Sequence, residues 1–194
     1  GKLKQHEALL REVRRIAKQC QFFHWALQFP DVFQRVENGF DVELMNPPWE
    51  RLNLEDQQFF ALKRPDFSNL TTSQRKIQIS RLKEDDHTLF ELYTEAKRGS
   101  ESEIKFNLSS GVFPYRTQSR LNSYALFLNR ARSVASPTGR IGIIIPSGIA
   151  TDLPYKDFFA YMIANQEVVS LFDFENRRGL FTDVHRMYKF CLLS

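Results

Sequence analysis

The stretch that decides the fold is Phe40-Asp41-Val42-Glu43-Leu44-Met45-Asn46-Pro47-Pro48-Trp49. Its first six residues alternate apolar and polar side chains and then end apolar, a pattern that suits a strand running into a sheet. Gly39 separates this strand from the chain before it. The sequence therefore predicts a strand over residues 40–45, which delivers Asn46 at its carboxyl end.

Further along the chain, helices and strands are expected to alternate. The run 140–146 is apolar without polar alternation, so we expect both of its faces to be covered, as in the interior of a parallel sheet. The expected order is a helix marked by Leu121, Ala125, Leu128 and Ala131 and ended by Ser136-Pro137-Thr138-Gly139, a strand over 140–146, a helix over 155–165, and strands over 167–174 and 187–193. This order predicts an α/β layer structure with right-handed connections.

The amino-terminal segment, residues 1–20, is basic. It carries Lys2, Lys4, Arg11, Arg14, Arg15 and Lys18 against Glu7 and Glu12, so the net charge of +4 belongs to this segment. Leu9, Val13, Ile16 and Cys20 recur at helical spacing and predict a basic amphipathic helix over 2–20. This helix is either packed with a solvated outer face or an arm that contacts DNA. Pro30 then argues against one continuous helix through the aromatic segment 22–33.

Residues 50–120 differ in character, because they lack a convincing strand and their charge is segregated. The part at 63–83 is basic and the part at 84–103 is acidic. We interpret 50–120 as a largely helical insertion whose basic part suits phosphate groups, and an ordinary solvated surface is the alternative. The candidate nucleic-acid contacts are Lys63, Arg64, Arg75, Lys76, Arg81 and Lys83.

The composition indicates a folded domain, which we expect in the cytoplasm. Apolar residues make up 42% and 18 residues are Phe, which excludes a disordered chain. No apolar run approaches the roughly 20 residues that cross a bilayer, and the basic amino terminus is not followed by an apolar signal stretch. We expect Cys20 and Cys191 to be reduced. Cys20 and His24 lack the further ligands of a zinc site, so no metal is expected.

The four residues Asn46-Pro47-Pro48-Trp49 suit methylation of an exocyclic adenine amine. This amine is a poor nucleophile, because its lone pair is delocalised into the ring, and it needs acceptors for both amino hydrogens. The Asn46 side-chain oxygen and a neighbouring main-chain carbonyl can accept them, since two prolines fix the backbone before substrate arrives. Trp49 offers a flat face to an extruded base, and such stacking contributes about 1–3 kcal/mol per base. In open α/β sheets, ligands bind beyond the carboxyl ends of strands, where these residues are expected. A simple turn out of the strand is the alternative.

With these residues the chain resembles the large adenine-N6 DNA methyltransferases of bacterial restriction-modification and phage-exclusion systems. The likeness covers most of residues 22–49 and 121–194. Its motifs are Phe23-His24-Trp25, Phe29-Pro30-Asp31-Val32-Phe33, Gly39-Phe40-Asp41, Asn46-Pro47-Pro48-Trp49, Gly139-Arg140-Ile141-Gly142, Pro146-Ser147, Phe174-Glu175-Asn176, Leu180-Phe181, Val184-His185 and Tyr188-Lys189-Phe190.

The resemblance implies a Rossmann-like class I methyltransferase sheet, of which this chain holds the later strands, the last one antiparallel. It implies S-adenosylmethionine as cofactor, contacted by Asn46 and Pro47, and double-stranded DNA with a flipped adenine as substrate. It assigns catalytic roles to Asn46, Pro47, Pro48 and Trp49, and none to His24 or His185. The family's glycine-rich cofactor loop is not recognisable here, so we expect it upstream and interpret 21–194 as a partial catalytic domain. The rest of the methyltransferase, or a restriction subunit, is the expected partner.

Two other interpretations stay open. The chain can be a non-catalytic remnant of a methyltransferase, which binds DNA or a partner subunit through the basic part at 63–83 and the terminal helix. It can also be a methyltransferase that acts on RNA or on protein glutamine, because related Asn-Pro-Pro signatures serve those substrates. A response to S-adenosylmethionine separates the remnant from the enzymes, and the methylated product separates the enzymes from each other.

Overall fold

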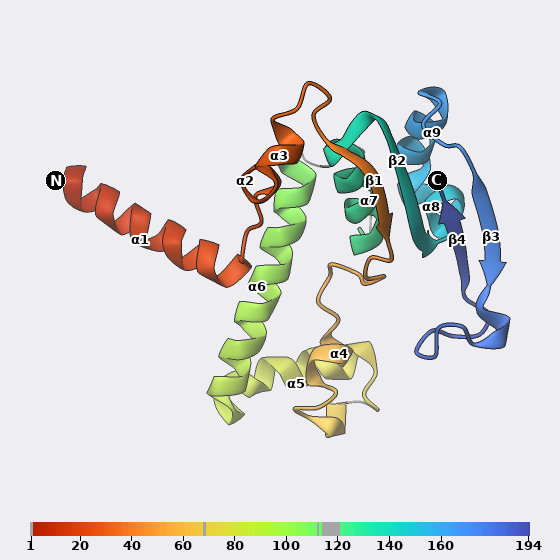
Figure 1. Ribbon diagram of the computed structural model, residues 1–194. Coiled ribbons are helices and arrows are strands. Elements are labelled where there is room, and N and C mark those ends of the chain that lie inside the picture. The colour runs from red at the N-terminus through yellow and green to blue at the C-terminus, as the bar shows by residue number, and fades with distance from the viewer. Residues whose placement is uncertain (1, 68, 112, 114–120) are drawn as a thin grey trace. The chain divides into compact units, whose positions relative to one another are not determined.

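The computed structural model describes residues 2–67, 69–111, 113 and 121–194 (Figure 1). The chain forms two compact units. Unit 1 comprises Gly1–Val42 and Val134–Arg140, and unit 2 comprises Glu43–Ser133 and Ile141–Ser194. The end of the predicted insertion, at 114–120, lies outside the described residues.

Unit 1 contains three helices, α1 (Lys2–Cys20), α2 (Trp25–Gln28) and α3 (Pro30–Phe33). The predicted helix over 2–20 and the predicted interruption at Pro30 are both confirmed. Proline has no N–H to continue a helix, which explains why α2 stops where α3 begins. The apolar stripe of α1 is exposed, with Leu9 at 63% and Val13 at 52%.

Phe40 is the centre of an aromatic cluster in unit 1. The rings of Trp25, Phe29 and Phe33 meet it edge to face, with centroid separations of 5.7, 5.3 and 5.5 Å. Aromatic pairs prefer this geometry, because the positive edge of one ring meets the negative face of the other. The predicted aromatic segment therefore forms a partly exposed ring cluster in this unit.

Gly39 lets two backbone segments of unit 1 touch. Its φ is +128°, and a Cβ there would lie 2.5 Å from the carbonyl carbon of Ala135 and from the nitrogen of Ser136. Only glycine fits such a position. This contact lies at the start of β2, where the structure differs from the sequence prediction: residues 136–139 do not end a helix in a turn but belong to β2, which begins at Ala135.

The four strands form one sheet with the order β1-β2-β4-β3. Their bounds are Phe40–Met45 (β1), Ala135–Pro146 (β2), Leu171–Glu175 (β3) and Lys189–Leu193 (β4). The arrows of β1 and β2 point the same way in Figure 1. β4 is antiparallel to both of its neighbours, with Cys191 opposite Ile145 and Asp173. The predicted α/β class is confirmed, and so is the antiparallel direction of the last strand.

β3 begins four residues later than predicted. The N–H of Glu167 donates to the carbonyl of Met162 at 2.9 Å, which closes α9 (Lys156–Ala164). The carboxylate of Glu167 also accepts two hydrogen bonds from Arg132, at 2.5 and 2.8 Å. The contacts with Met162 and Arg132 hold Glu167 outside the strand, although the apolar residues that follow it have a strand pattern.

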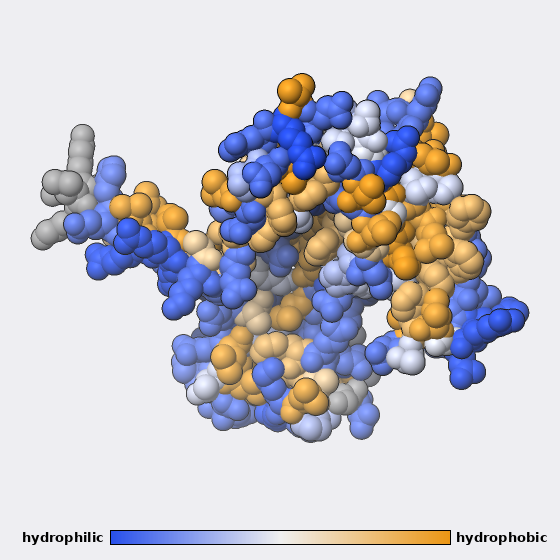
Figure 2. All heavy atoms as spheres, in the orientation of Figure 1, coloured by the Kyte–Doolittle hydropathy of each residue, from blue (hydrophilic) through white to orange (hydrophobic). Residues whose placement is uncertain are grey.

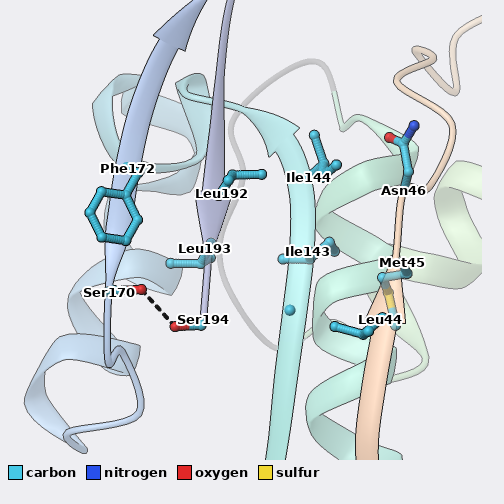
Figure 3. Close-up of a pocket in the computed structure, with 11 residues that line it drawn as sticks. Leu44, Met45, Asn46, Ile143, Ile144, Ser170, Phe172, Leu192, Leu193 and Ser194 are labelled. Carbon is cyan, nitrogen blue, oxygen red and sulfur yellow. Dashed lines mark hydrogen bonds between the residues drawn. The ribbon is translucent and has the colours of Figure 1, made fainter.

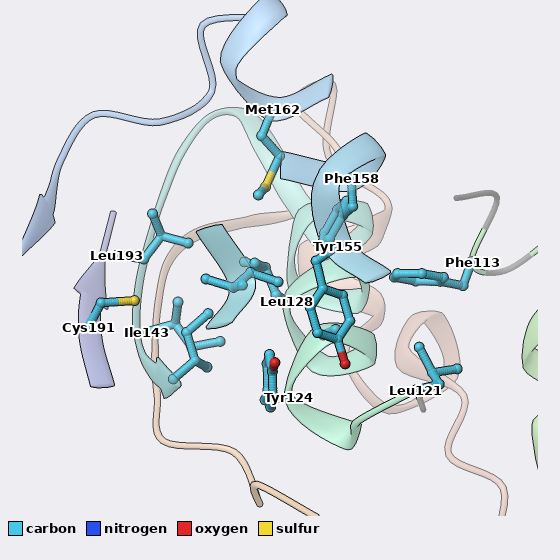
Figure 4. Packing of buried hydrophobic residues seen from close by; sticks show 13 residues of the cluster. Phe113, Leu121, Tyr124, Leu128, Ile143, Tyr155, Phe158, Met162, Cys191 and Leu193 are labelled. Carbon is cyan, nitrogen blue, oxygen red and sulfur yellow. The ribbon is translucent and has the colours of Figure 1, made fainter. Parts of the chain in front are cut away.

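Helices cover one face of the sheet in unit 2 (Figure 4). They are α7 (Ser123–Val134), α8 (Gly148–Thr151), the short helix η2 (Leu153–Tyr155) and α9. Ile143, Ile145, Cys191 and Leu193 point from the sheet into a core shared with Tyr124, Ala125, Leu128, Tyr155, Phe158 and Met162. Burial raises the pKa of the Cys191 thiol to about 11. This cysteine is therefore an apolar core group rather than a nucleophile.

The opposite sheet face is largely uncovered in unit 2. Leu44, Phe172 and Leu192 are 83%, 60% and 40% exposed. They line an apolar hollow of about 530 Å³ together with Gly142 and Ile144 (Figure 3). The expectation that both faces of the strand over 140–146 are covered is thus met on one face of the described sheet and wrong for the other.

The insertion folds around its own apolar cluster. Its elements are α4 (Asp56–Phe60), η1 (Pro65–Phe67), α5 (Thr72–Asp85) and α6 (His87–Ser109), so the described part is helical as predicted. Thr71 and Gln74 form a capping box at the start of α5. The buried members of the cluster are Phe60, Phe67, Ile79, Leu82, Leu89 and Tyr93.

We predict that the two sheet faces respond differently to truncation of a side chain. Ile145→Ala leaves a cavity in the core and is expected to lower the free energy of unfolding by about 2–5 kcal/mol. Leu44→Ala, on the uncovered face of the neighbouring strand, is expected to change it by less than about 0.5 kcal/mol. Urea unfolding of both variants checks this, and an equal loss would contradict the assignment of the faces.

Candidate functional site

Asn46 lies where β1 ends, at the carboxyl edge of the sheet beside β2 (Figure 3). Its side chain is exposed, whereas Pro47 next to it is buried. Among the residues that the structure describes, the Asn46 amide makes no hydrogen bond. An amide in this state offers one acceptor oxygen and two donor hydrogens to a ligand.

Ser123, the first residue of α7, fixes the backbone that follows Asn46. Its hydroxyl donates to the carbonyl of Pro48 at 2.6 Å and accepts the N–H of Glu50 at 3.1 Å. The N–H of Ser123 also donates to the carbonyl of Glu50 at 2.9 Å, and the N–H of Leu52 donates to the carbonyl of Leu121 at 3.1 Å. The turn is therefore held rigidly before any ligand arrives.

Trp49 is half-buried in a second aromatic cluster. Its indole N–H donates to the carbonyl of Ile144 at 3.3 Å. Its ring stacks on Tyr188 and Phe190 at centroid distances of 6.0 and 6.2 Å and meets Phe181 edge to face at 5.1 Å. The role predicted for Trp49 did not include contacts with these three rings. The sequence placed all three in the motifs Leu180-Phe181 and Tyr188-Lys189-Phe190 of the resemblance, but it did not predict that they contact Trp49.

Charged groups lie near the aromatic cluster. Burial raises the pKa of Tyr188, and the carboxylate of Asp152 raises it further while the guanidinium of Arg51 lowers it. Gly148 makes room for that carboxylate, because a Cβ at Gly148 would lie 2.5 Å from Asp152 Oδ2. His185 accepts the N–H of Met187 at its Nδ1 atom, a contact that stabilises the loop after β3.

The apolar hollow reaches Asn46 but does not include Trp49. Its polar lining consists of Asn46, Ser170 and Ser194, and the hydroxyls of the two serines bond to each other at 2.7 Å (Figure 3). No carboxylate is part of this lining within the described residues. The chain thus offers the exposed Asn46 amide to a cofactor or substrate, while the hollow itself suits apolar groups.

The six predicted nucleic-acid contacts do not form one surface. Arg75 is 8% exposed, and its guanidinium donates to the carbonyls of Leu70 at 2.9 Å and Phe67 at 3.5 Å. This burial contradicts a phosphate contact by Arg75. Arg64 pairs with Asp66 at 2.8 Å and lies over the Phe67 ring, so its charge is already engaged.

The other predicted cations are exposed but point in different directions. Lys63 lies over the Phe59 ring at 4.4 Å. Lys76 and Lys83 share one side of α5, because seven residues make almost two turns. Arg81 is about 140° away from Lys76 around the helix at 3.6 residues per turn. The structure therefore brings together only Lys76 and Lys83 on α5.

Glu43, three residues before Asn46, has a partly buried carboxyl group. Its Oε1 atom is buried and makes no hydrogen bond within the described part of the chain. Burial raises the pKa of this carboxyl to about 7. Side chains alternate along a strand, so Glu43 shares its side of β1 with Met45, which packs against the core.

The pKa of Glu43 predicts a pH dependence of stability. Its ordinary pKa is 4.5 and its folded pKa is about 7, so the folded protein keeps a proton that the unfolded chain releases between these values. The contribution of this group to the free energy of unfolding therefore falls as the pH rises from about 4.5 to about 7. Glu43→Gln is expected to remove this fall, on the order of 1 kcal/mol after solvent screening. Urea unfolding of both proteins across this pH range measures the difference, and parallel curves would contradict it.

Ser123→Ala tests how the turn is fixed. The variant leaves the Pro48 carbonyl and the Glu50 N–H without their partner in a part-buried place, and we expect a loss of about 1–3 kcal/mol in the free energy of unfolding. Ser133→Ala on the same helix is the matched control, because within the described residues that exposed hydroxyl bonds only to the Arg130 side chain and carbonyl. Similar losses in the two variants, measured by urea unfolding, would show that Ser123 has no special role.

Comparisons of this chain with models of protein families, with curated proteins and with solved structures found no match. In the part of the chain that the structure describes, no helix combines the length and apolarity needed to cross a membrane. Nor do three or more His, Cys, Asp or Glu residues gather there as a possible metal site.

Proposed function

We propose that this chain is part of an S-adenosylmethionine-dependent DNA methyltransferase that modifies the N6 amine of adenine, in a restriction-modification or phage-defence system. One observation carries the proposal. The Asn46-Pro47-Pro48-Trp49 turn leaves a sheet strand at its carboxyl edge, with the Asn46 amide exposed and the backbone behind it held by Ser123.

The proposed chemistry needs two fixed acceptors for one amine. The Asn46 side-chain oxygen is the first, since the amide has no other partner in the described residues. Ser123 engages the carbonyl of Pro48. The carbonyl of Pro47, the residue after Asn46, is the proposed main-chain acceptor. Acceptors that are oriented before the reaction draw the amine nitrogen toward tetrahedral geometry, so its lone pair becomes available.

Trp49 supports the choice of a nucleobase as substrate. Its ring belongs to an aromatic cluster with Phe181 and Tyr188, and such rings stack on a base that has left the duplex. The bond from the indole N–H to Ile144 fixes the orientation of the ring. A fixed aromatic plane loses little conformational freedom when a base stacks on it.

S-adenosylmethionine supplies the methyl group when bound, and Asn46 and Pro47 are the residues of this chain proposed to contact it. An exposed amide fits hydrogen bonding to a polar cofactor. The hollow's lining, which holds no carboxylate among the described residues, does not fit the ribose hydroxyls.

Asn46→Ala is expected to lower methyl transfer at least about 100-fold, because one preoriented group for the transition state is lost. The measurement uses the polypeptide encoded by the complete reading frame, duplex DNA and S-adenosylmethionine labelled in the methyl group. Asn53→Ala is the matched control, since Asn53 is an exposed amide in the same segment and has no proposed role. It should keep full activity.

The products of this experiment also separate the alternatives. Label in N6-methyladenine of DNA supports the proposal, and equal activity of Asn46→Ala would overturn its mechanism. Label in RNA or in protein glutamine would assign a different substrate. Salt-sensitive DNA binding without any methyl transfer, and with no response to S-adenosylmethionine, would identify a non-catalytic binding module.

A further inference from the structure

The connection between β3 and β4 is organised by one buried side chain, that of Asn176. It is 1% exposed. Its amide nitrogen donates to the carbonyls of Phe181 and Val184, both at 2.9 Å, and its amide oxygen accepts the N–H of Phe181 at 3.0 Å. Its main-chain N–H donates to the carbonyl of Tyr188 at 2.9 Å. We call residues 176–188 the Asn176 loop, and its beginning, middle and end are all fixed by this residue.

The Asn176 loop presents arginines to solvent. Arg177, Arg178 and Arg186 are all exposed. Arg177 pairs with Glu175 at 3.3 Å, whereas Arg178 and Arg186 have no ion-pair partner in the described ranges. Figure 2 shows strongly hydrophilic side chains gathered beside apolar ones around the β3–β4 connection. Two arginines are thus available for an outside anion.

The same loop supplies two of the rings that contact Trp49. Phe181 meets Trp49 edge to face at 5.1 Å, and Tyr188 stacks on it at 6.0 Å. Arg186 is two residues from Tyr188, a distance that the backbone spans in at most about 7 Å. Arg178 is three residues from Phe181. Each of the two available arginines therefore precedes, by two or three residues, a ring that contacts Trp49.

We propose that the Asn176 loop binds the phosphodiester backbone of double-stranded DNA through Arg178 and Arg186, next to the base that stacks on Trp49. This inference rests on the proposed function and adds a partner surface that the basic insertion does not provide. Guanidinium groups match the geometry of phosphate oxygens and form charge-assisted hydrogen bonds with them. A loop that is already fixed loses little conformational freedom on binding.

Arginines at these positions can hold the DNA backbone while a base is turned out of the duplex. A nucleotide that leaves the duplex must be held by its backbone while the base is stacked, and phosphate contacts supply position without reading the sequence. The Asn176 loop carries both arginines and two of the rings that contact Trp49, so it can supply such contacts. The predicted surface at 63–83 lacks this arrangement, because its arginines are buried, ion-paired or on another side of α5 from the lysines.

The test measures how the affinity for a labelled DNA duplex falls with salt concentration. We expect Arg178→Gln and Arg186→Gln each to reduce the slope of log affinity against log salt by about 1, and the double variant by about 2. Arg178→Lys and Arg186→Lys keep the charge and should restore most of the slope. Arg130→Gln, an exposed arginine on α7, is the control and should keep the wild-type slope. Fluorescence anisotropy on the protein from its complete reading frame supplies the data.

The outcomes separate this inference from the proposed function. Wild-type slopes in both Gln variants would overturn the role of the Asn176 loop, while the Asn46→Ala loss of methyl transfer would still stand. Preference for single-stranded RNA over the DNA duplex, with the same arginine dependence, would also overturn it. Reduced slopes in the Gln variants together with normal methyl transfer by the Arg130→Gln control support it.

Discussion

The hydroxyl of Ser123 is the contact on which the rest of the site depends. It joins the turn after β1 to the first residue of α7, although 75 positions separate Ser123 from Pro48 in the sequence. The insertion begins and ends at this junction, so its helices form a separate cluster without disturbing the strand–helix connection. The same bonds fix the main chain at Pro48 and Glu50 and leave the Asn46 amide exposed. The two prolines favour the backbone geometry of the turn, and the hydrogen bond from Ser123, which is distant in sequence, fixes it.

The aromatic side chains form a separate cluster in each of the two units, and the two clusters differ in where they lie. In unit 1 the rings of Trp25, Phe29 and Phe33 contact Phe40 and form a partly exposed cluster. In unit 2, Trp49 and its partners lie at the carboxyl edge of the sheet, where a strand ends and a loop begins. Composition alone could not distinguish the two clusters, because both contain one tryptophan and several phenylalanines. The two clusters differ because they lie at different places along the strands.

The fold was predictable where the signal is local. The alternation over Phe40–Met45 and the proline at position 30 each set the backbone through their own chemistry, and the structure agrees with both. Contacts between distant residues could not be predicted. Arg75 and Lys76 are neighbours with the same charge, yet only packing in the insertion decides that Arg75 is buried. The start of β3 likewise depends on the pairing of Glu167 with Arg132, which no periodicity reveals. For the candidate site, the sequence indicated Asn46 and Trp49 but not the role of Ser123. It contained Asn176 and the rings around Trp49 in the motifs of the resemblance, but it did not predict their contacts.

The uncovered face of the sheet continues into the aromatic cluster. Phe174 stacks on Phe190 at 5.6 Å, and Phe190 in turn contacts Trp49. Phe190 alternates along β4 with the core residues Cys191 and Leu193, so its side chain points away from the helices. Apolar surface of this kind gains free energy when it leaves water. Leu44, Phe172 and Leu192 thus lie on the same sheet face as Phe190, and Phe190 connects this exposed apolar face to the ring of Trp49.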